Sequence, residues 1–234
     1  MLEAITIGSA VAAAGIAGGY YAAYGIRSQV FGETIWRGRT DTNAIALTFD
    51  DGPGESTPAI LDVLKQYQIT ATFFVVGSQV ERYPELARRI AREGHLIGNH
   101  SFSHPIFLYR TPHKTRRELA ASQEIISRVT GTTPTVARPP CGVRTPAYFS
   151  SARRLGLKTV QWTVAGFDWQ NIGASDIAAN VTKGLAAGSI ILLHDGDDKL
   201  LNSRVETVRA LPIIIEAVRS NDMQIVPLKE LCGW

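Results

Sequence analysis

The chain has 234 residues, of which 45% are hydrophobic and 19% are charged, and its formal net charge is +3. A chain of this length and apolar content can bury one sizeable core, so we expect one main domain. The mild, interspersed charge argues against a nucleic-acid partner, which would require a basic stripe. Cys141 and Cys232 lie too far apart in the chain to indicate a disulfide framework or a thiolate zinc site. No obligate protein partner is indicated.

The N-terminal region carries no charge from Ala4 to Ile26, a length that can span a bilayer as a helix. The chain opens with Met1, Leu2 and Glu3, which is unlike the basic start of a secretory signal. These features predict an uncleaved single-pass anchor in the cell membrane, followed by a linker, over residues 1–35. The alternative is a helix buried against the main domain.

The side of the membrane stays open at this stage. Arg27, Arg37 and Arg39 follow the apolar segment, whereas Glu3 is the only charged side chain before it. The positive-inside tendency would therefore place the main domain in the cytoplasm.

From residue 36 onward, apolar β-type runs alternate with segments of helical pattern. The predicted strands are Ala44–Phe49, Ala71–Gly77, His95–Asn99, Val136–Pro139, Lys158–Val164, Ser189–Leu193 and Gln224–Leu228. The predicted helices are Pro58–Gln68, Pro84–Arg92, Lys114–Val129, Pro146–Leu155, Ser175–Leu185 and Val205–Arg219. Such alternation predicts an α/β domain over residues 36–234, with parallel strands in a barrel or in an open doubly wound sheet.

Ionisable residues occupy the C-terminal ends of several predicted strands, where α/β proteins gather their functional groups. They are Asp50 and Asp51 after the first strand, His100 after the third, Arg138 in the fourth, and His194 with Asp195 after the sixth.

The adjacent acids Asp50 and Asp51 point to opposite faces if the strand is regular, so they cannot share one task side by side. A solvated strand end before a turn is the simpler interpretation. His100 and His104, however, are four residues apart, which would place both imidazoles on one side of a helical turn. With one carboxylate they form a ligand set typical of zinc or another divalent metal, and the second aspartate stays free to take a proton.

Hydrolysis at such a site also needs an acid for the leaving group and a donor for the oxyanion. His194, which follows the run IILL, is a candidate acid. Arg138 is a candidate ion-pair partner for the free aspartate. Each of these residues could instead be an ordinary strand-end side chain.

Five motifs in order, LTFDDGP, NHSFSH, ARPPCG, GFDW and ILLHD, are similar to those of the polysaccharide deacetylase (NodB-homology) family. The resemblance extends over residues 44–228. It implies a distorted (β/α) barrel of about seven parallel strands, here preceded by the N-terminal apolar helix. It also implies a metal-dependent N-deacetylase whose partner is an N-acylated amino sugar in a polysaccharide, peptidoglycan or lipid-linked glycan.

The first three motifs imply a base and a metal site. Asp50 would be the general base, and Asp51, His100 and His104 would bind one divalent metal. Zinc is the first candidate, with cobalt, nickel, manganese or iron as the others. Arg138 would orient Asp50.

The remaining positions imply the groups that face the substrate. The backbone N–H of Cys141 would bind the oxyanion, and Trp169 with Leu192 would form the acyl pocket. His194 would protonate the departing amine, and Asp168 belongs to the Asp-Trp motif.

Two positions depart from the family pattern. Members often have an aromatic residue in place of Cys141, which puts the sugar platform in question. They also often have an acid three residues before the Asp-Trp pair, where this chain has Ala165, so the tuning of His194 is in question. Cys141 could also be read as a nucleophile, although a complete metal site makes that role redundant.

Two other functions remain as alternatives to a deacetylase. One is a catalytically silent barrel that binds glycans, and the other is a metal phosphoesterase, which would not need the apolar wall at Trp169 and Leu192. Many enzymes of the family work outside the cell, which conflicts with the positive-inside inference.

Overall fold

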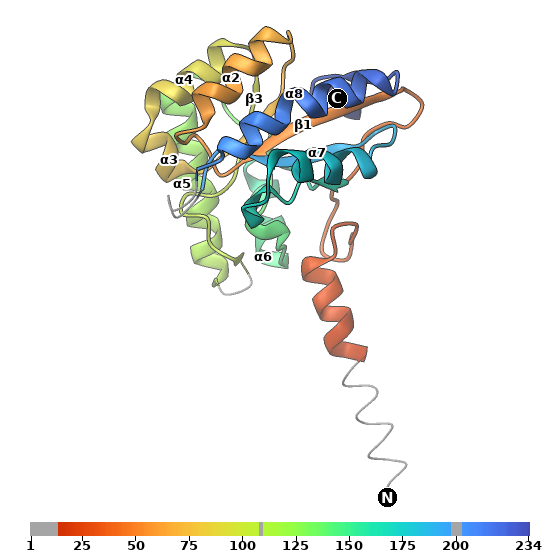
Figure 1. Ribbon diagram of the computed structural model, residues 1–234. Coiled ribbons are helices and arrows are strands. Elements are labelled where there is room, and N and C mark those ends of the chain that lie inside the picture. Colours follow the sequence, from red (N-terminus) through yellow and green to blue (C-terminus); the bar gives the residue numbers. More distant parts are fainter. Residues whose placement is uncertain (1–13, 108–109, 198–202) are drawn as a thin grey trace, which may run out of the picture.

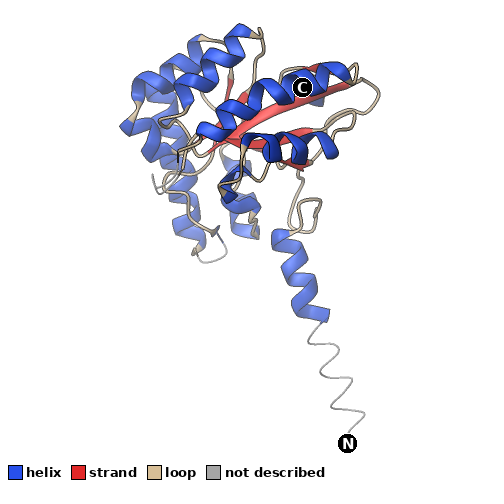
Figure 2. Cartoon of the chain, in the orientation of Figure 1, coloured by secondary structure: helices blue, strands red, loops and turns tan. Residues whose placement is uncertain are grey.

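The computed structural model describes residues 14–107, 110–197 and 203–234. Its centre is a parallel sheet (Figures 1 and 2). The strands follow the order β5-β4-β3-β2-β1-β7-β6, with β8 beside β1. The strands are β1 (Ala44–Asp50), β2 (Thr72–Val75), β3 (Leu96–Asn99), β4 (Val136–Ala137), β5 (Lys158–Thr159), β6 (Val164–Ala165), β7 (Ile190–His194) and β8 (Gln224–Ile225).

The sheet confirms the predicted α/β class and its parallel strands, but it forms a curled half-barrel. The predicted strand Lys158–Val164 divides into β5 and β6, which are the two edge strands of the order above. Between them the backbone pairs with Ile35 instead of with a strand of the sheet: Ile35 bridges Val160, and the backbone N–H of Gln161 donates to the Ile35 carbonyl. The half-barrel therefore stays open on this side.

Most of the helices cover the outer face of the sheet (Figure 1), whereas the last one, α9, packs on the inner face. The helices are α2 (Thr57–Gln66), α3 (Gly77–Arg82), α4 (Pro84–Arg92), α5 (Pro112–Thr130), α6 (Pro146–Arg154), α7 (Ala174–Lys183), α8 (Val205–Ser220) and α9 (Leu228–Cys232). Local chemistry sets several ends: the Thr111 and Thr145 side chains cap α5 and α6, and Gly131 ends α5 at φ 72°. The short helices α3 and α9 were not among the predicted elements.

Strand β1 shows how the two faces of the sheet are used. Ile45, Leu47 and Phe49 join the larger core, between the sheet and the outer helices. Ala44 and Ala46 join a smaller core on the inner face, which α9 covers with its leucines. Because side chains alternate along a strand, the following even-numbered residues of β1 also point inward.

The N-terminal helix, which covers 14–24, projects from the body of the protein (Figure 1). Part of the predicted segment Ala4–Ile26 lies outside the described residues. Among the residues that the structure describes, no helix has the length and apolar character needed to cross a membrane.

Residues of the predicted linker contact the part of the chain predicted as the main domain, 36–234. Ala22 and Ala23 are buried, and the Ala23 carbonyl accepts from the backbone N–H of Arg144. Ile35 forms a parallel bridge with Val160 beside the sheet. Several residues between 22 and 35 therefore pack against residues 36–234.

Candidate active site

At the C-terminal end of β1, the adjacent residues Asp50 and Asp51 both face one cavity. Asp50 ends the strand on its inner face, in register with His194 of β7. Asp51 has φ 72°, in the left-handed region that non-glycine residues seldom adopt. This change of backbone direction brings the Asp51 side chain into the same cavity as Asp50. The expectation that adjacent residues point to opposite faces therefore holds within β1 but fails at Asp51, which follows the last residue of the strand.

His100 and His104 also meet, with ring centroids 5.0 Å apart, but the predicted helical turn is wrong. Residues 100–106 form an irregular segment in which Ser101 and His104 have φ values of 68° and 52°. The backbone N–H of Ser101 donates to the Asn99 side chain, and that of His104 donates to the Ser101 hydroxyl. Positive φ values at these two residues prevent a right-handed helix.

The two histidines and Asp51 form a donor set that fits a divalent cation. Oδ1 of Asp51 is buried and accepts no hydrogen bond, and it lies 3.4 Å from Nε2 of His100 and 3.1 Å from Nε2 of His104. Nδ1 of His100 lies 2.7 Å from the carbonyl of Arg138, which fixes the tautomer that leaves Nε2 as a ligand. Among the described residues, this is the one cluster of its kind.

Electrostatics at Asp51 agree with a metal ligand. Burial alone would raise the pKa of the Asp51 carboxyl, but the neighbouring imidazoles of His100 and His104 hold this pKa well below its ordinary value. The side chain is therefore a carboxylate at neutral pH.

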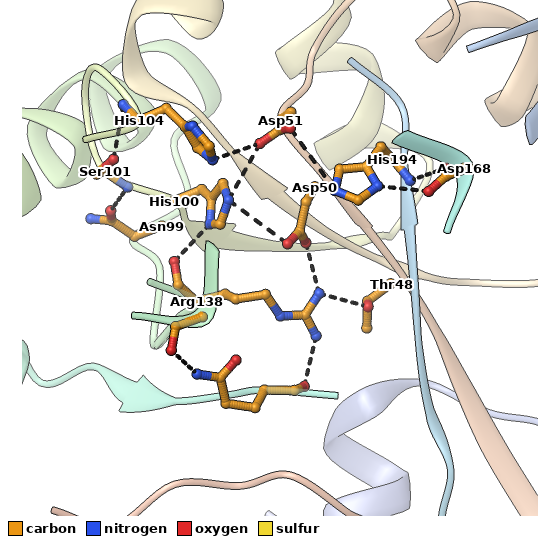
Figure 3. A network of polar contacts seen from close by, with 12 residues as sticks. Thr48, Asp50, Asp51, Asn99, His100, Ser101, His104, Arg138, Asp168 and His194 are labelled. Atoms are coloured by element: carbon orange, nitrogen blue, oxygen red, sulfur yellow. Dashed lines mark hydrogen bonds and ion pairs between the residues drawn. The ribbon is translucent and has the colours of Figure 1, made fainter. Parts of the chain in front are cut away.

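Asp50 is held by a buried arginine. Nη1 of Arg138 donates to Oδ1 of Asp50 at 2.7 Å and to the Thr48 hydroxyl at 2.8 Å, while Nη2 donates to the Gln161 carbonyl at 2.8 Å (Figure 3). The guanidinium also lies 4.2 Å from the centre of the Phe74 ring. Thr48 lies in the motif LTFDDGP, two residues before Asp50 on the same face of β1, so the sequence could have identified it as a partner of Arg138. No local sequence signal identifies Gln161 as the other partner.

His194 is paired with Asp168 on the other side of Asp51 from His104 (Figure 3). Nδ1 of His194 lies 2.8 Å from Oδ1 of Asp168, and the backbone N–H of His194 donates to Oδ2. Burial would lower the pKa of His194, but the Asp168 carboxylate outweighs it and raises the pKa to about 9. The Thr207 hydroxyl also donates to Asp168 at 2.8 Å, a partner that sequence reasoning missed and that no local signal marks.

A cavity of about 420 Å³ opens over these groups. Trp169 lies at its side with its ring edge-on to His194, at 5.3 Å between centroids, and Leu192 forms part of the wall. Cys141 is exposed and lines the cavity at φ 53°. Trp162, which was not predicted, supplies a further aromatic wall beside Cys141.

The structure accounts for one of the two departures from the family pattern. Ala165 lies in β6, in register with Leu192, and is nearly buried. His194 receives its carboxylate partner from Asp168 directly, without an acid at position 165.

The sequence matches known proteins over most of its length. Residues 37–160 match the family model of polysaccharide deacetylases. A peptidoglycan-N-acetylglucosamine deacetylase of Bacillus cereus is 38% identical over 80% of this chain and 67% of its own length. A chitooligosaccharide deacetylase of a Bradyrhizobium species is 38% identical over 81% of this chain and 91% of its own length.

Solved structures share the fold. A peptidoglycan N-acetylglucosamine deacetylase in complex with 4-naphthalen-1-yl-N-oxidanyl-benzamide superposes with a TM-score of 0.80 at 35% identity, covering 86% of this chain and 92% of that chain. A family 4 carbohydrate esterase pseudoenzyme from Bacillus anthracis superposes with a TM-score of 0.78 at 26% identity, covering 85% of this chain and 68% of that chain.

Proposed function

Because the chain belongs to the polysaccharide deacetylase family, we propose that it is a metal-dependent hydrolase that removes the N-acetyl group from an amino sugar of a glycan. One observation carries this proposal: Asp50 held by Arg138 and His194 held by Asp168 both lie beside the cluster of Asp51, His100 and His104. Oδ2 of Asp50 is 3.7 Å from Nε2 of His100, and Nε2 of His194 is 3.9 Å from Oδ2 of Asp51. Hydrolysis of an amide needs such a base and acid around one reacting carbon.

Asp51, His100 and His104 would hold the metal, and zinc is the first candidate because it favours a small set of nitrogen and oxygen ligands. Cobalt, nickel, manganese or iron could bind the same ligand types. When bound, a divalent cation supplies Lewis acidity, which lowers the pKa of a coordinated water and polarises the acyl carbonyl.

Asp50 takes the proton from the attacking water in this proposal. Its Oδ1 is occupied by Arg138, whereas Oδ2 lies 3.7 Å from Nε2 of His100, on the metal side of the carboxylate. The Arg138 guanidinium thus orients the base toward the cluster.

His194 gives a proton to the departing amine, which is a poor leaving group unless it is protonated. The Asp168 carboxylate keeps the imidazole protonated at neutral pH and points Nε2 toward the cavity. Burial would raise the pKa of Asp168, but the neighbouring His194 lowers it, so the pair is ionised.

The acetyl group would lie against the wall formed by Trp169 and Leu192, and the backbone N–H of Cys141 would donate to the oxyanion. The Trp162 ring offers the sugar an apolar surface near Cys141.

Release of acetate from a soluble N-acetylated oligosaccharide, measured with and without a chelator, tests the proposal. We expect activity that is lost on chelation and restored by zinc. Activity on phosphate esters alone would favour the phosphoesterase. Glycan binding without turnover would favour the catalytically silent barrel, and one structural relative is described as a pseudoenzyme.

The metal ligands have a separate test. A His100→Ala, His104→Ala double variant should lose close to one equivalent of metal relative to the wild type, as measured by elemental analysis. Full retention of metal would show that the ligands lie elsewhere.

We also propose that the N-terminal part of the chain holds residues 36–234 at the cell membrane. The support is the uncharged stretch Ala4–Ile26 and the exposure of Ile16, Tyr20 and Tyr21 on the projecting helix. Aromatic residues of this kind favour the bilayer interface. A topology reporter after Trp234 locates the domain, and recovery of the full chain in the soluble fraction would refute the anchor.

The anchor bears on the choice of glycan. An enzyme tethered to the membrane meets a lipid-linked amino sugar at high effective concentration, which favours this substrate. For a peptidoglycan or chitin-type substrate, the anchor would only keep the enzyme at the cell surface. Paired assays on lipid-linked and soluble acetylated oligosaccharides distinguish the two kinds of substrate. Faster turnover of a soluble acetylated tetrasaccharide would exclude a preference for lipid-linked sugars.

A further inference from the structure

Asp195, the residue after His194, is a buried acid that the proposed reaction does not use. It is 0% exposed, and its Oδ1 atom has no hydrogen-bond partner. Its backbone N–H donates to the Asp50 carbonyl at 3.1 Å, so it sits directly behind the strand end that carries the base. A buried acid in such a place calls for a structural or functional reason.

The Asp195 side chain packs directly against the turn that presents Asp51. A Cβ atom added to Gly52 would lie 2.0 Å from Oδ2 of Asp195, and one added to Gly196 would lie 2.6 Å from the Asp51 carbonyl oxygen. Real Cβ atoms do not approach so closely, so glycine is required at both positions. The two segments touch backbone to backbone just behind the Asp51 carboxylate.

A threonine links Asp195 to the far end of the same turn. Thr57, the first residue of α2, donates from its hydroxyl to Oδ2 of Asp195 at 2.6 Å. The same hydroxyl accepts from the backbone N–H of Gly54 at 2.7 Å. Thr57 is 0% exposed, so water is not available to replace either bond. The turn of residues 51–54 is thus fixed at both ends.

We propose that Asp195 is a positioning residue for the metal site: through Gly52 and Thr57 it holds the turn in the form that aims Asp51 at His100 and His104. Asp51 needs this support because its φ of 72° lies in the left-handed region, which is unfavourable for a non-glycine residue. The inference rests on the metal site of the proposed function, and it is independent of the sugar substrate.

The experiment measures zinc affinity by competition with a chromogenic chelator, on metal-free protein whose fold is checked by circular dichroism. The variants are Asp195→Ala, Thr57→Val, which removes the hydroxyl at nearly constant volume, and Thr57→Ser, which keeps it. Thr72→Val is the matched control, because Thr72 is also 0% exposed and its hydroxyl has no hydrogen-bond partner.

We expect Asp195→Ala and Thr57→Val to weaken zinc binding by about 10–100-fold, the usual effect of losing a group that orients a metal ligand. Thr57→Ser and Thr72→Val should bind zinc within about threefold of the wild type on the same scale. A group that only stabilised the fold would lower the melting temperature without changing the zinc affinity of the folded protein.

Wild-type zinc affinity in folded Thr57→Val would overturn the inference, even if Asp195→Ala failed to fold. Absence of zinc binding by the wild-type protein would instead refute the metal site itself. Zinc binding that follows the expected pattern, without any release of acetate from glycans, would uphold the inference and refute the deacetylase. The experiment therefore distinguishes failure of the inference about Asp195, failure of the metal site and failure of the deacetylase assignment.

Discussion

Single residues at this site take their chemical roles from their neighbours. Asp50 and Asp51 are adjacent and chemically identical, yet one is bound by an arginine and the other faces two imidazoles. The difference arises from one backbone angle, the φ of 72° at Asp51, which directs the second carboxylate away from Arg138. This difference is the basis for proposing Asp50 as the base and Asp51 as a metal ligand.

Replacing the base should separate catalysis from metal binding. Asp50→Asn keeps the size of the side chain and removes its capacity to take a proton, so kcat should fall by about 10²–10⁴-fold. Metal content, measured by elemental analysis, should stay at the wild-type level because Asp51, His100 and His104 are unchanged. Wild-type turnover in this variant would show that the reaction needs no base at this position.

The acid should be sensitive to its carboxylate partner. A His194 pKa of about 9 keeps the imidazole protonated at neutral pH, and the proton is lost as the pH rises through that value. In Asp168→Asn the carboxylate that raises this pKa is gone while burial still lowers it. The alkaline limb of the profile of kcat/KM against pH should therefore move to lower pH.

Asp176→Asn, on the exposed surface of α7, is the control for the Asp168 variant and should leave the profile unchanged. An unshifted alkaline limb in Asp168→Asn would mean that a group other than His194 sets it.

At the scale of elements, short segments outside the predicted helices and strands position the site. The oxyanion candidate Cys141 lies in the 3₁₀ helix η2 (Pro140–Gly142), and Asp168 lies in η3 (Asp168–Gln170). Arg144, just after η2, is 0% exposed and donates through Nη2 to the Gly25 carbonyl. The segment that follows the N-terminal helix is thereby tied to the loop that carries Cys141.

Removal of residues 1–28 should consequently destabilise the catalytic part. It would leave the buried guanidinium and backbone N–H of Arg144 without the Gly25 and Ala23 carbonyls, and an unsatisfied buried donor costs about 1–3 kcal/mol. For a chain of this size that cost lowers the melting temperature by roughly 2–4 °C per kcal/mol.

A chain that begins at residue 14 is the control for this truncation, because it keeps all of these partners of Arg144. Equal melting temperatures for the chains that begin at residues 14 and 29 in differential scanning calorimetry would contradict the prediction.

At the scale of the whole molecule, the half-barrel brings its functional groups to one end from strands that are far apart in the sequence. Arg138 and Asp50 are 88 residues apart in the chain, and Asp168 and His194 are 26 apart. The proposed metal ligands, base and acid meet only in the folded chain, so metal binding and folding should be thermodynamically linked.

Metal removal should therefore lower global stability. Zinc at 100 times its dissociation constant stabilises the folded state by about 2.7 kcal/mol if the unfolded chain does not bind it. Dialysis against a chelator should lower the melting temperature by roughly 5–10 °C for a chain of this length. The His100→Ala, His104→Ala variant should show no such shift, and an equal shift in both proteins would assign the stabilising ion to another site.

The sequence alone determined the residue types of the site and the class of fold. Alternation along β1 put Ala44, Ala46 and Asp50 on one face of the sheet. Because the C-terminal ends of parallel strands lie at one edge, the location of the functional residues could be predicted from their positions along the strands. The predicted helix Lys114–Val129 lies within α5, which is capped by Thr111 and ended by Gly131.

Only the tertiary structure decided how these groups are held. His100 and His104 meet through an irregular turn, the sheet remains open between β5 and β6, and Gln161, Thr207 and Asp195 support Arg138, Asp168 and Asp51. Propensity and periodicity describe a residue and its near neighbours along the chain, whereas each of these features depends on contacts between distant segments or on φ values that such contacts impose. The physical information that fixes them is therefore absent from any local pattern.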